Sequence, residues 1–116
     1  MIKLKVPFSH LKILSIEKEL DFEFKIATLE CATMDVLKCD LWEIGKQNPY
    51  DLNIAILYAG YVIACKDKFK RPKHTFEQAI YWFQHMSSDS HKEFLSACTE
   101  LMGQLQKGNG KEEKKK

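Results

Sequence analysis

The stretch DLNIAILYAGYVIAC, from Asp51 to Cys65, decides the fold of this chain more than any other. From Leu52 onward, only Asn53 and Gly60 depart from apolar or aromatic character. A helix that is apolar on nearly all sides is normally buried on nearly all sides, so we expect a central helix on which the other elements pack, or one whose spare face meets another subunit. Asp51 is the expected N-cap. Because Gly60 lowers helix stability by about 1 kcal/mol relative to alanine, it indicates a close helix crossing.

Two further helices are expected after a basic loop over residues 66–74, in which Pro72 marks the end of helical structure. Thr75 begins a capping box, and the helix that it opens has an inward face: Phe76, Ala79, Ile80 and Phe83. The last helix is expected to be capped by Ser90, which begins a second capping box, or by Asp89 one residue earlier, and carries one apolar stripe: Phe94, Cys98, Leu101, Met102 and Leu105.

The first 26 residues show the alternation of apolar and charged side chains that is typical of β-strands. The alternation occurs over residues 2–6 and again over 22–26, so we expect these runs to pair as an antiparallel ribbon with lysine and glutamate on its wet face. Residues 11–16 fit either a third strand or a short helix.

A helical period begins at Ala27, with Thr28 as the expected cap and one apolar face: Leu29, Ala32, Val36 and Leu37. Residues 41–44 either continue this helix or form another turn before Gly45. The predicted fold class is therefore mainly α: a small helical bundle around a central apolar helix, with a short extended or β N-terminal segment.

The composition is that of one small domain. The chain has 116 residues, 45% of them hydrophobic, which is enough for a single core. The segment 107–116 holds five lysines and two glutamates, whereas the formal net charge of the chain is only +2, so residues 1–106 are close to neutral. We expect one mostly helical domain over 1–106, extended over 1–26 and helical over 27–106. Gly108 to Gly110 should end the last helix, and the tail 107–116 should be disordered.

Several classes of protein are disfavoured by these features. A near-neutral body argues against nucleic-acid binding by the whole domain. The apolar run over 52–65 is too short to span a bilayer, and residues 2–6 are too short and too lysine-rich for a signal peptide. The cysteines form no C-x-x-C pair and are expected as core thiols in a reducing cytosol: Cys31, Cys39, Cys65 and Cys98. The expected localisation is cytoplasmic.

No pattern of a catalytic or cofactor site occurs in the sequence. The four histidines lack the spacing of metal ligands, and the one metal alternative is a zinc site built from Cys31, Cys39 and a distant histidine. There is no nucleophile elbow and no glycine-rich phosphate-binding motif. We therefore expect a protein that is not an enzyme and that needs neither a cofactor nor a metal.

Two surfaces are candidates for contacts with a partner. If Ala79, Ile80 and Phe83 face the core, Tyr81 and Trp82 on the same helix point partly outward. An exposed tryptophan indicates a surface that contacts a partner. The basic loop offers an electrostatic patch for an acidic partner or phosphate, although a solvated loop is the simpler interpretation: Lys68, Lys70, Arg71 and Lys73.

The layout of residues 20–106 resembles the tail assembly chaperones of long-tailed bacteriophages and prophages. The resemblance is carried by FEFKIATLE at 22–30, by DLNIAILYAG at 51–60, and by a Thr-capped helix and a last amphipathic helix at 75–83 and 90–105. It implies a protein of the bacterial host cytoplasm that makes no covalent bonds. Such a protein binds the tape-measure protein, a long helical chain, and keeps it soluble until tail-tube subunits polymerise around it.

A chaperone of this kind needs an exposed apolar or aromatic groove that accepts amphipathic helices. The candidate surface, chosen from the pattern and not from a family motif, combines Trp82 and Tyr81 with Tyr58 and Tyr61 of the central helix. Self-association through the spare apolar surface of that helix is a related expectation.

The C-terminus supplies a second indication. Several tail assembly chaperones are made in two forms, the longer one by a programmed ribosomal frameshift, and Lys114 to Lys116 can be encoded by a slippery adenine run. A disordered, solubilising tail is the simpler explanation of the same residues.

Two other classes of function remain open from the sequence. The two helices joined by residues 84–89 fit a helix-turn-helix of a DNA-binding regulator, although the outward set on the second helix is only weakly basic: His91, Lys92, Ser96 and Thr99. The other class is a helical interaction or adaptor domain without a longer translation product.

Overall fold

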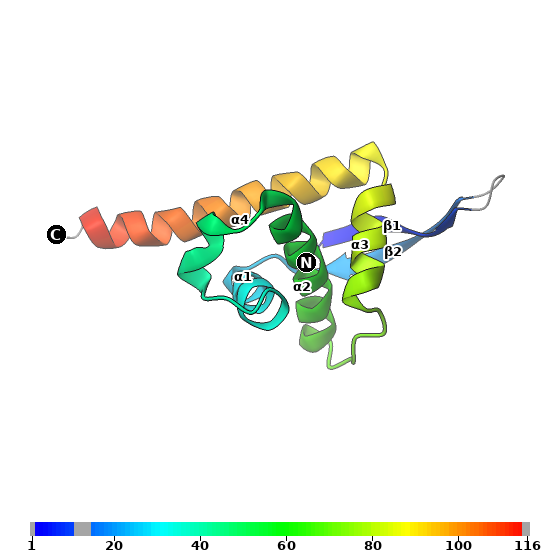
Figure 1. Cartoon of the computed structure of the whole chain (residues 1–116), viewed down its shortest axis with the longest axis horizontal. Helices are drawn as coiled ribbons and strands as arrows, with labels where there is room; N and C mark the ends of the chain where they lie inside the picture. Colours follow the sequence, from blue (N-terminus) through cyan, green and yellow to red (C-terminus); the bar gives the residue numbers. More distant parts are fainter. Residues whose placement is uncertain (1, 11–14, 115–116) are drawn as a thin grey trace.

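The computed structural model describes residues 2–10 and 15–114. The described chain is mainly helical, as expected, with one short two-stranded antiparallel sheet. Its elements are β1 (Ile2–His10), β2 (Ser15–Phe22), α1 (Ile26–Glu30), the π-helix η1 (Cys31–Val36), the 3-10 helix η2 (Leu41–Lys46), α2 (Pro49–Asp67), α3 (Phe76–His85) and α4 (Ser88–Lys114). In Figure 1, α4 runs along one side of the molecule and its C-terminal half projects beyond the other elements.

The ribbon pairs Ile2 with Phe22 and Leu4 with Leu20, so the alternating apolar residues of β1 and the end of β2 share the inner face. Leu4 and Phe22 are buried, as is Val6, whereas the lysines between them are exposed. The expected second strand at 22–26 is wrong, because β2 covers 15–22 and α1 begins at Ile26. Pairing with the nearer segment needs only a short connection, which makes the hairpin the easier closure.

The first helical segment differs from the expected cap. Lys25 holds the N-cap position, and the Thr28 hydroxyl accepts a hydrogen bond from the Lys25 N–H at 3.1 Å while donating to the Glu23 carbonyl at 2.6 Å. Thr28 is thus the third residue of the capping box and is buried. Leu29 is buried on the expected inner face. After η1, the turn η2 passes through Gly45 before ending at Lys46.

Helix α2 begins three residues earlier than the sequence indicated. The Asn48 side chain is the N-cap, accepting from Tyr50 N–H at 2.8 Å and Asp51 N–H at 3.4 Å, with Pro49 at the first helical position. Asp51 is therefore inside the first turn and is not the cap. Asn-Pro supplies both the capping acceptor and the helical φ angle, which outweighs an aspartate further along. Helix α2 contacts β2, α1, η1, α3 and α4.

Gly60 allows a close approach, but not by another helix. The ring of Phe24 lies over it, so that a Cβ on Gly60 would come within 2.5 Å of Phe24 Cε1. The Gly60 carbonyl also accepts a hydrogen bond from Glu23 N–H at 3.0 Å. The expected helix crossing is therefore corrected to a crossing by the segment that joins β2 to α1.

The last two helices follow the sequence in part. The Thr75 hydroxyl accepts from Gln78 N–H at 3.3 Å, which confirms Thr75 as the N-cap of α3. The expected start of α4 is wrong, because Ser87 Oγ accepts from Ser90 N–H at 3.2 Å and the helix begins at Ser88. Its apolar stripe is confirmed, with Phe94 buried together with Cys98 and Leu101.

The end of α4 also differs from expectation. The backbone remains helical to Lys114 and passes through Gly108 to Gly110, where we expected the helix to end and a disordered tail to begin. Each glycine weakens a helix by about 1 kcal/mol, but Lys107 before this segment and Lys111 and Glu112 after it favour the helix, and no proline interrupts it.

Candidate functional site

The aromatic residues expected at the partner surface are mostly inside the protein. Trp82 has 0% exposure and Tyr61 has 5%, whereas Tyr58 and Tyr81 are partly buried. The Trp82 ring lies edge-on to Phe22, with ring centroids 6.1 Å apart, and to Tyr61 at 5.6 Å. The expectation that Trp82 and Tyr61 form an exposed platform is therefore wrong.

The physical reason is the position of the ribbon. β1 packs against α3 on one side while α2 packs against it on another, so the buried arc of α3 is wider than one helical face. Figure 1 shows the β1–β2 ribbon passing across α3. Trp82 faces this junction, where its ring also meets Phe8 at 5.8 Å. A helical period alone cannot show that a distant strand covers a second face.

Tyr61 has a structural role at the base of the basic loop. Its hydroxyl accepts hydrogen bonds from Lys73 N–H at 2.7 Å and from His74 N–H at 3.3 Å, which ties the loop to α2. Burial raises the pKa of Tyr61, so the hydroxyl stays protonated and neutral at physiological pH.

His74 is packed into the same aromatic cluster. Its ring centroid lies 4.9 Å from that of Phe8 and 5.5 Å from that of Trp82. Burial lowers the pKa of His74 below its ordinary value of 6.5, and the positive charges of Lys18 and Lys73 lower it further. The folded protein therefore favours the neutral imidazole.

The free energy of unfolding is expected to fall as the pH drops from about 7 to about 5, because the unfolded chain then binds a proton that the folded chain resists. Since the pKa is lowered on folding, the stabilisation is present above the ordinary pKa and is lost as the pH falls through the folded pKa. Urea denaturation at a series of pH values should show a smaller slope for His74→Phe than for the wild type. Equal slopes in the two proteins would assign the pH dependence to other groups.

An open apolar groove lies between α2 and α4, near the N-terminal end of α2, where Figure 1 shows the two helices meeting. Its volume is about 630 Å³. Helix α2 contributes Leu52, Asn53 and Ile56, and α4 contributes Leu95, Cys98, Thr99, Met102 and Gly103. Both sets recur at helical spacing, which gives the groove two roughly linear walls.

Most side chains of the groove are apolar but incompletely covered. Leu95 is 37% exposed, whereas Ile56 and Cys98 are buried in its floor. Burial raises the pKa of Cys98 to about 12, so its thiol behaves as a small apolar group. The Thr99 hydroxyl donates a hydrogen bond to the Leu95 carbonyl at 3.0 Å, so its donor is used within α4. The groove therefore offers apolar contact with little polar chemistry.

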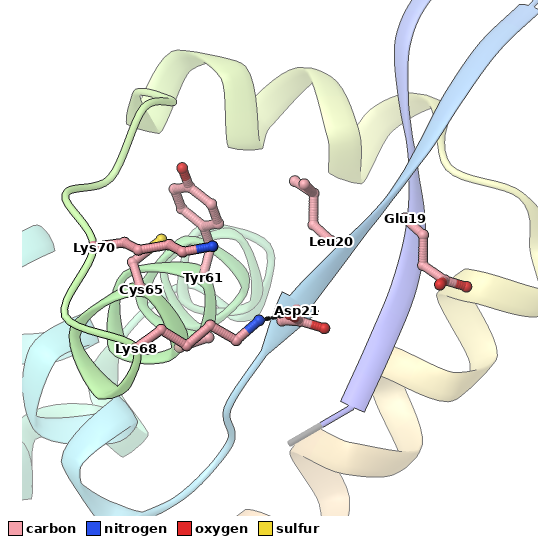
Figure 2. A pocket seen from close by; sticks show the side chains of 8 residues that line it. Glu19, Leu20, Asp21, Tyr61, Cys65, Lys68 and Lys70 are labelled. Carbon is pink, nitrogen blue, oxygen red and sulfur yellow. Dashed lines mark ion pairs between the residues drawn. The ribbon is translucent and has the colours of Figure 1, made fainter.

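A smaller pocket of about 170 Å³ lies between β2 and the end of α2 (Figure 2). Lys68 forms an ion pair with Asp21 across its mouth, while Glu19 points away from both. The pocket is lined mainly by residues of β2 and of the C-terminal part of α2, which pack against each other. We therefore assign the ion pair a structural role, holding β2 against α2.

The basic residues predicted as an electrostatic patch are all exposed: Lys68, Lys70, Arg71 and Lys73. The structure adds Phe69 to this surface, a residue that the sequence analysis did not select. Phe69 lies between Lys68 and Lys70 and is 99% exposed. The groove residues were also missed as a site. Their signal was present in the α4 stripe, but only the placement of α2 shows that part of this stripe is left open.

The groups that could support chemistry are sparse in the described part of the chain. No cluster of three or more histidine, cysteine, aspartate or glutamate side chains is arranged to hold a metal ion among the described residues. Cys31 and Cys39, the expected partners of a zinc site, are free thiols, as are Cys65 and Cys98. No described helix has both the length and the apolarity needed to cross a bilayer.

Comparison with known proteins gives no relative: the chain matches no protein-family model, and no curated protein or solved structure matches it significantly.

Proposed function

We propose that this protein is a non-enzymatic assembly chaperone whose α2–α4 groove holds an amphipathic helix of a protein partner. The observation that carries the proposal is the groove itself, an apolar cleft of about 630 Å³ with two helical walls. Amphipathic helices bind such grooves by placing apolar residues from successive turns between the walls. Met102 suits this role because a flexible thioether adapts to different apolar partners.

In this proposal α2 is the central apolar helix of the bundle and the fixed wall of the groove. Nine of its residues are buried, and its other faces are covered by the ribbon and the remaining helices. α4 is the second wall, and it projects beyond the body, so a bound helix would extend along it (Figure 1).

The partner we propose is the tape-measure protein of a long-tailed phage or prophage, with assembly of the tail tube as the process served, in the cytoplasm of the bacterial host. The support is the resemblance of residues 20–106 to tail assembly chaperones together with a groove of the shape that a long helical chain requires. The expected aromatic platform is replaced by this groove, since Trp82 and Tyr61 are buried.

The other functional classes find less support. A recognition helix of a helix-turn-helix is short, whereas α4 has 27 residues and packs against β1 and α2. An adaptor domain would use the same groove, but its gene would lack a longer frameshifted product.

The native gene tests the proposal before any protein is made. A slippery adenine heptamer in the codons after residue 107, leading into an overlapping −1 frame and followed by a very long gene, is the expected result. A mixed run of lysine codons without an overlapping frame would favour the adaptor domain.

Charge placed in the groove should weaken binding of the helical product of that long gene. Leu95→Lys and Met102→Lys are each expected to weaken binding at least about tenfold, because a buried cation is left without a partner. Leu95 and Met102 are both incompletely buried, so the unfolding free energy should change by about 1 kcal/mol or less. Isothermal titration calorimetry with helical segments of the long product measures the affinity, and urea denaturation measures the stability.

Met34→Lys is the matched control for this experiment. Met34 is 56% exposed and lies on η1, outside the groove, so the same substitution there should leave binding unchanged. Equal weakening by all three variants would show a nonspecific charge effect and would remove the groove from the proposal.

A further inference from the structure

Phe69 is the most exposed of the large apolar side chains that the structure describes, with 99% of its surface accessible. Its backbone has φ of 58°, the left-handed conformation that strongly favours glycine. A bulky aromatic residue is a rare choice there, and it gains no burial in exchange. Local stability therefore does not explain Phe69, and such an outlier is a reason to look for a function.

The backbone that carries Phe69 is held in place. Phe69 N–H donates to the Lys66 carbonyl at 3.0 Å and Lys70 N–H donates to the Cys65 carbonyl at 2.8 Å, which together form a Schellman motif at the end of α2. Further along, Tyr61 anchors the loop through its bonds to the N–H groups of residues 73 and 74. The ring is thus presented on a fixed turn.

The charge around the ring is positive. Lys66, Lys70, Arg71 and Lys73 are exposed on the same loop or at its start. Two nearby carboxylates are engaged, since Asp67 binds Lys25 at 2.9 Å and Asp21 binds Lys68, while Glu19 points away from Lys68 (Figure 2). A partner that meets Phe69 therefore also meets a cluster of cations.

We propose that this loop docks on an anionic phospholipid bilayer, with Phe69 inserted at the headgroup level and the surrounding cations on lipid phosphates. Aromatic rings partition to the membrane interface, and lysine and arginine beside them gain from the negative surface potential. A convex turn with one projecting ring suits a soft, flat surface that can close around it. The protein is then a peripheral binder, attached reversibly through one apolar residue and its charges.

Other anionic partners fit the geometry less well. Single-stranded nucleic acid is held by several rings that stack successive bases. The next rings along the loop are unavailable for stacking, because His74 packs on Tyr61 at 5.5 Å and Phe76 packs on Tyr58 at 5.8 Å. A protein partner would find a single projecting side chain without the apolar surround that usually excludes water from a hot spot.

Cosedimentation of the full chain with vesicles tests the proposal. The wild type is expected to bind vesicles of phosphatidylglycerol and phosphatidylcholine in equal parts, and not vesicles of phosphatidylcholine alone. Phe69→Gly should weaken binding about tenfold or more while leaving the melting temperature equal or higher, because glycine fits the left-handed turn. The double variant Lys70→Glu, Arg71→Glu should weaken binding more than about 25-fold, since each cation contributes about fivefold.

Matched controls separate the loop from general surface effects. Met34→Gly removes another exposed apolar side chain and Lys92→Glu reverses an exposed charge on α4, and neither should alter vesicle binding. The proposal is overturned if wild type fails to bind anionic vesicles, or if Phe69→Gly binds them as well as wild type does. It is also overturned if the same variants lose binding to oligothymidylate while wild type ignores the vesicles.

This inference stands apart from the groove proposed above. Leu52 and Phe69 lie at opposite ends of α2, which with 19 residues is about 28 Å long. Groove variants should leave vesicle binding intact, and loop variants should leave binding of the helical partner intact, so either proposal can fail alone.

Discussion

Trp82→Ala is expected to lower the free energy of unfolding by about 3–5 kcal/mol, the largest effect of any single substitution considered for this protein. The indole is fully buried and meets the rings of Phe22, Tyr61 and His74, so alanine leaves a cavity where the ribbon, α2 and α3 converge. Urea denaturation followed by far-ultraviolet circular dichroism measures the change, because the signal does not depend on the deleted indole.

Trp82→Phe is the matched control. Trp82 Nε1 is buried without a hydrogen-bond partner among the described residues, so phenylalanine removes an unsatisfied donor while keeping most of the ring contacts. We expect a loss of less than about 1.5 kcal/mol. An alanine variant with unchanged stability and lost partner binding would restore the surface role that the sequence suggested for Trp82.

Gly60→Ala is expected to destabilise the fold by about 1–3 kcal/mol, although alanine is the better helix former by about 1 kcal/mol. The new methyl group would lie 2.5 Å from Phe24 Cε1. The Phe24 ring cannot move freely, because it stacks on Phe22 at 6.1 Å and packs against Phe94 at 5.7 Å. Chemical denaturation of the single variant gives the change in unfolding free energy.

A double-mutant cycle with Phe24→Ala makes this prediction sharper. In the Phe24→Ala background, Gly60→Ala should be neutral or stabilising, so the two substitutions are strongly non-additive. Gly103→Ala on α4 is the control, since a Cβ there meets nothing within 4 Å and should stabilise by up to about 1 kcal/mol. Additive effects of Gly60→Ala and Phe24→Ala would contradict the close approach.

Local chemistry in the sequence was sufficient for much of the helical framework. Thr75 was identified as a cap because its hydroxyl lies three residues before a free N–H, which is a contact within one turn. The α4 stripe through Phe94 and Leu101 was identified because its period is that of a helix. The N-caps of α2 and α4, Asn48 and Ser87, were missed because nearby Asp and Ser residues are equally good capping residues. Which of them becomes the N-cap depends on the direction from which the preceding segment enters the helix.

The candidate site was less accessible from the sequence. Met102 belongs to the same apolar stripe as Leu101, yet Leu101 is buried, whereas Met102 lines an open groove together with Leu95, a residue outside the stripe. The difference arises from where α2 and the ribbon lie, which periodicity does not contain. Phe69 did have a signal in the sequence, as a single aromatic residue among lysines after the end of a helix.

By itself the sequence determined the mainly helical class, the amphipathic stripe of α4 and the alternating inner face of β1, because these depend on residues within a few positions of one another. Only the tertiary structure decided that Trp82 is core, that Gly60 receives the ring of Phe24, and that a groove remains between α2 and α4. Each of these depends on elements far apart in the chain meeting at one place, and burial is a property of that meeting and not of the residue alone.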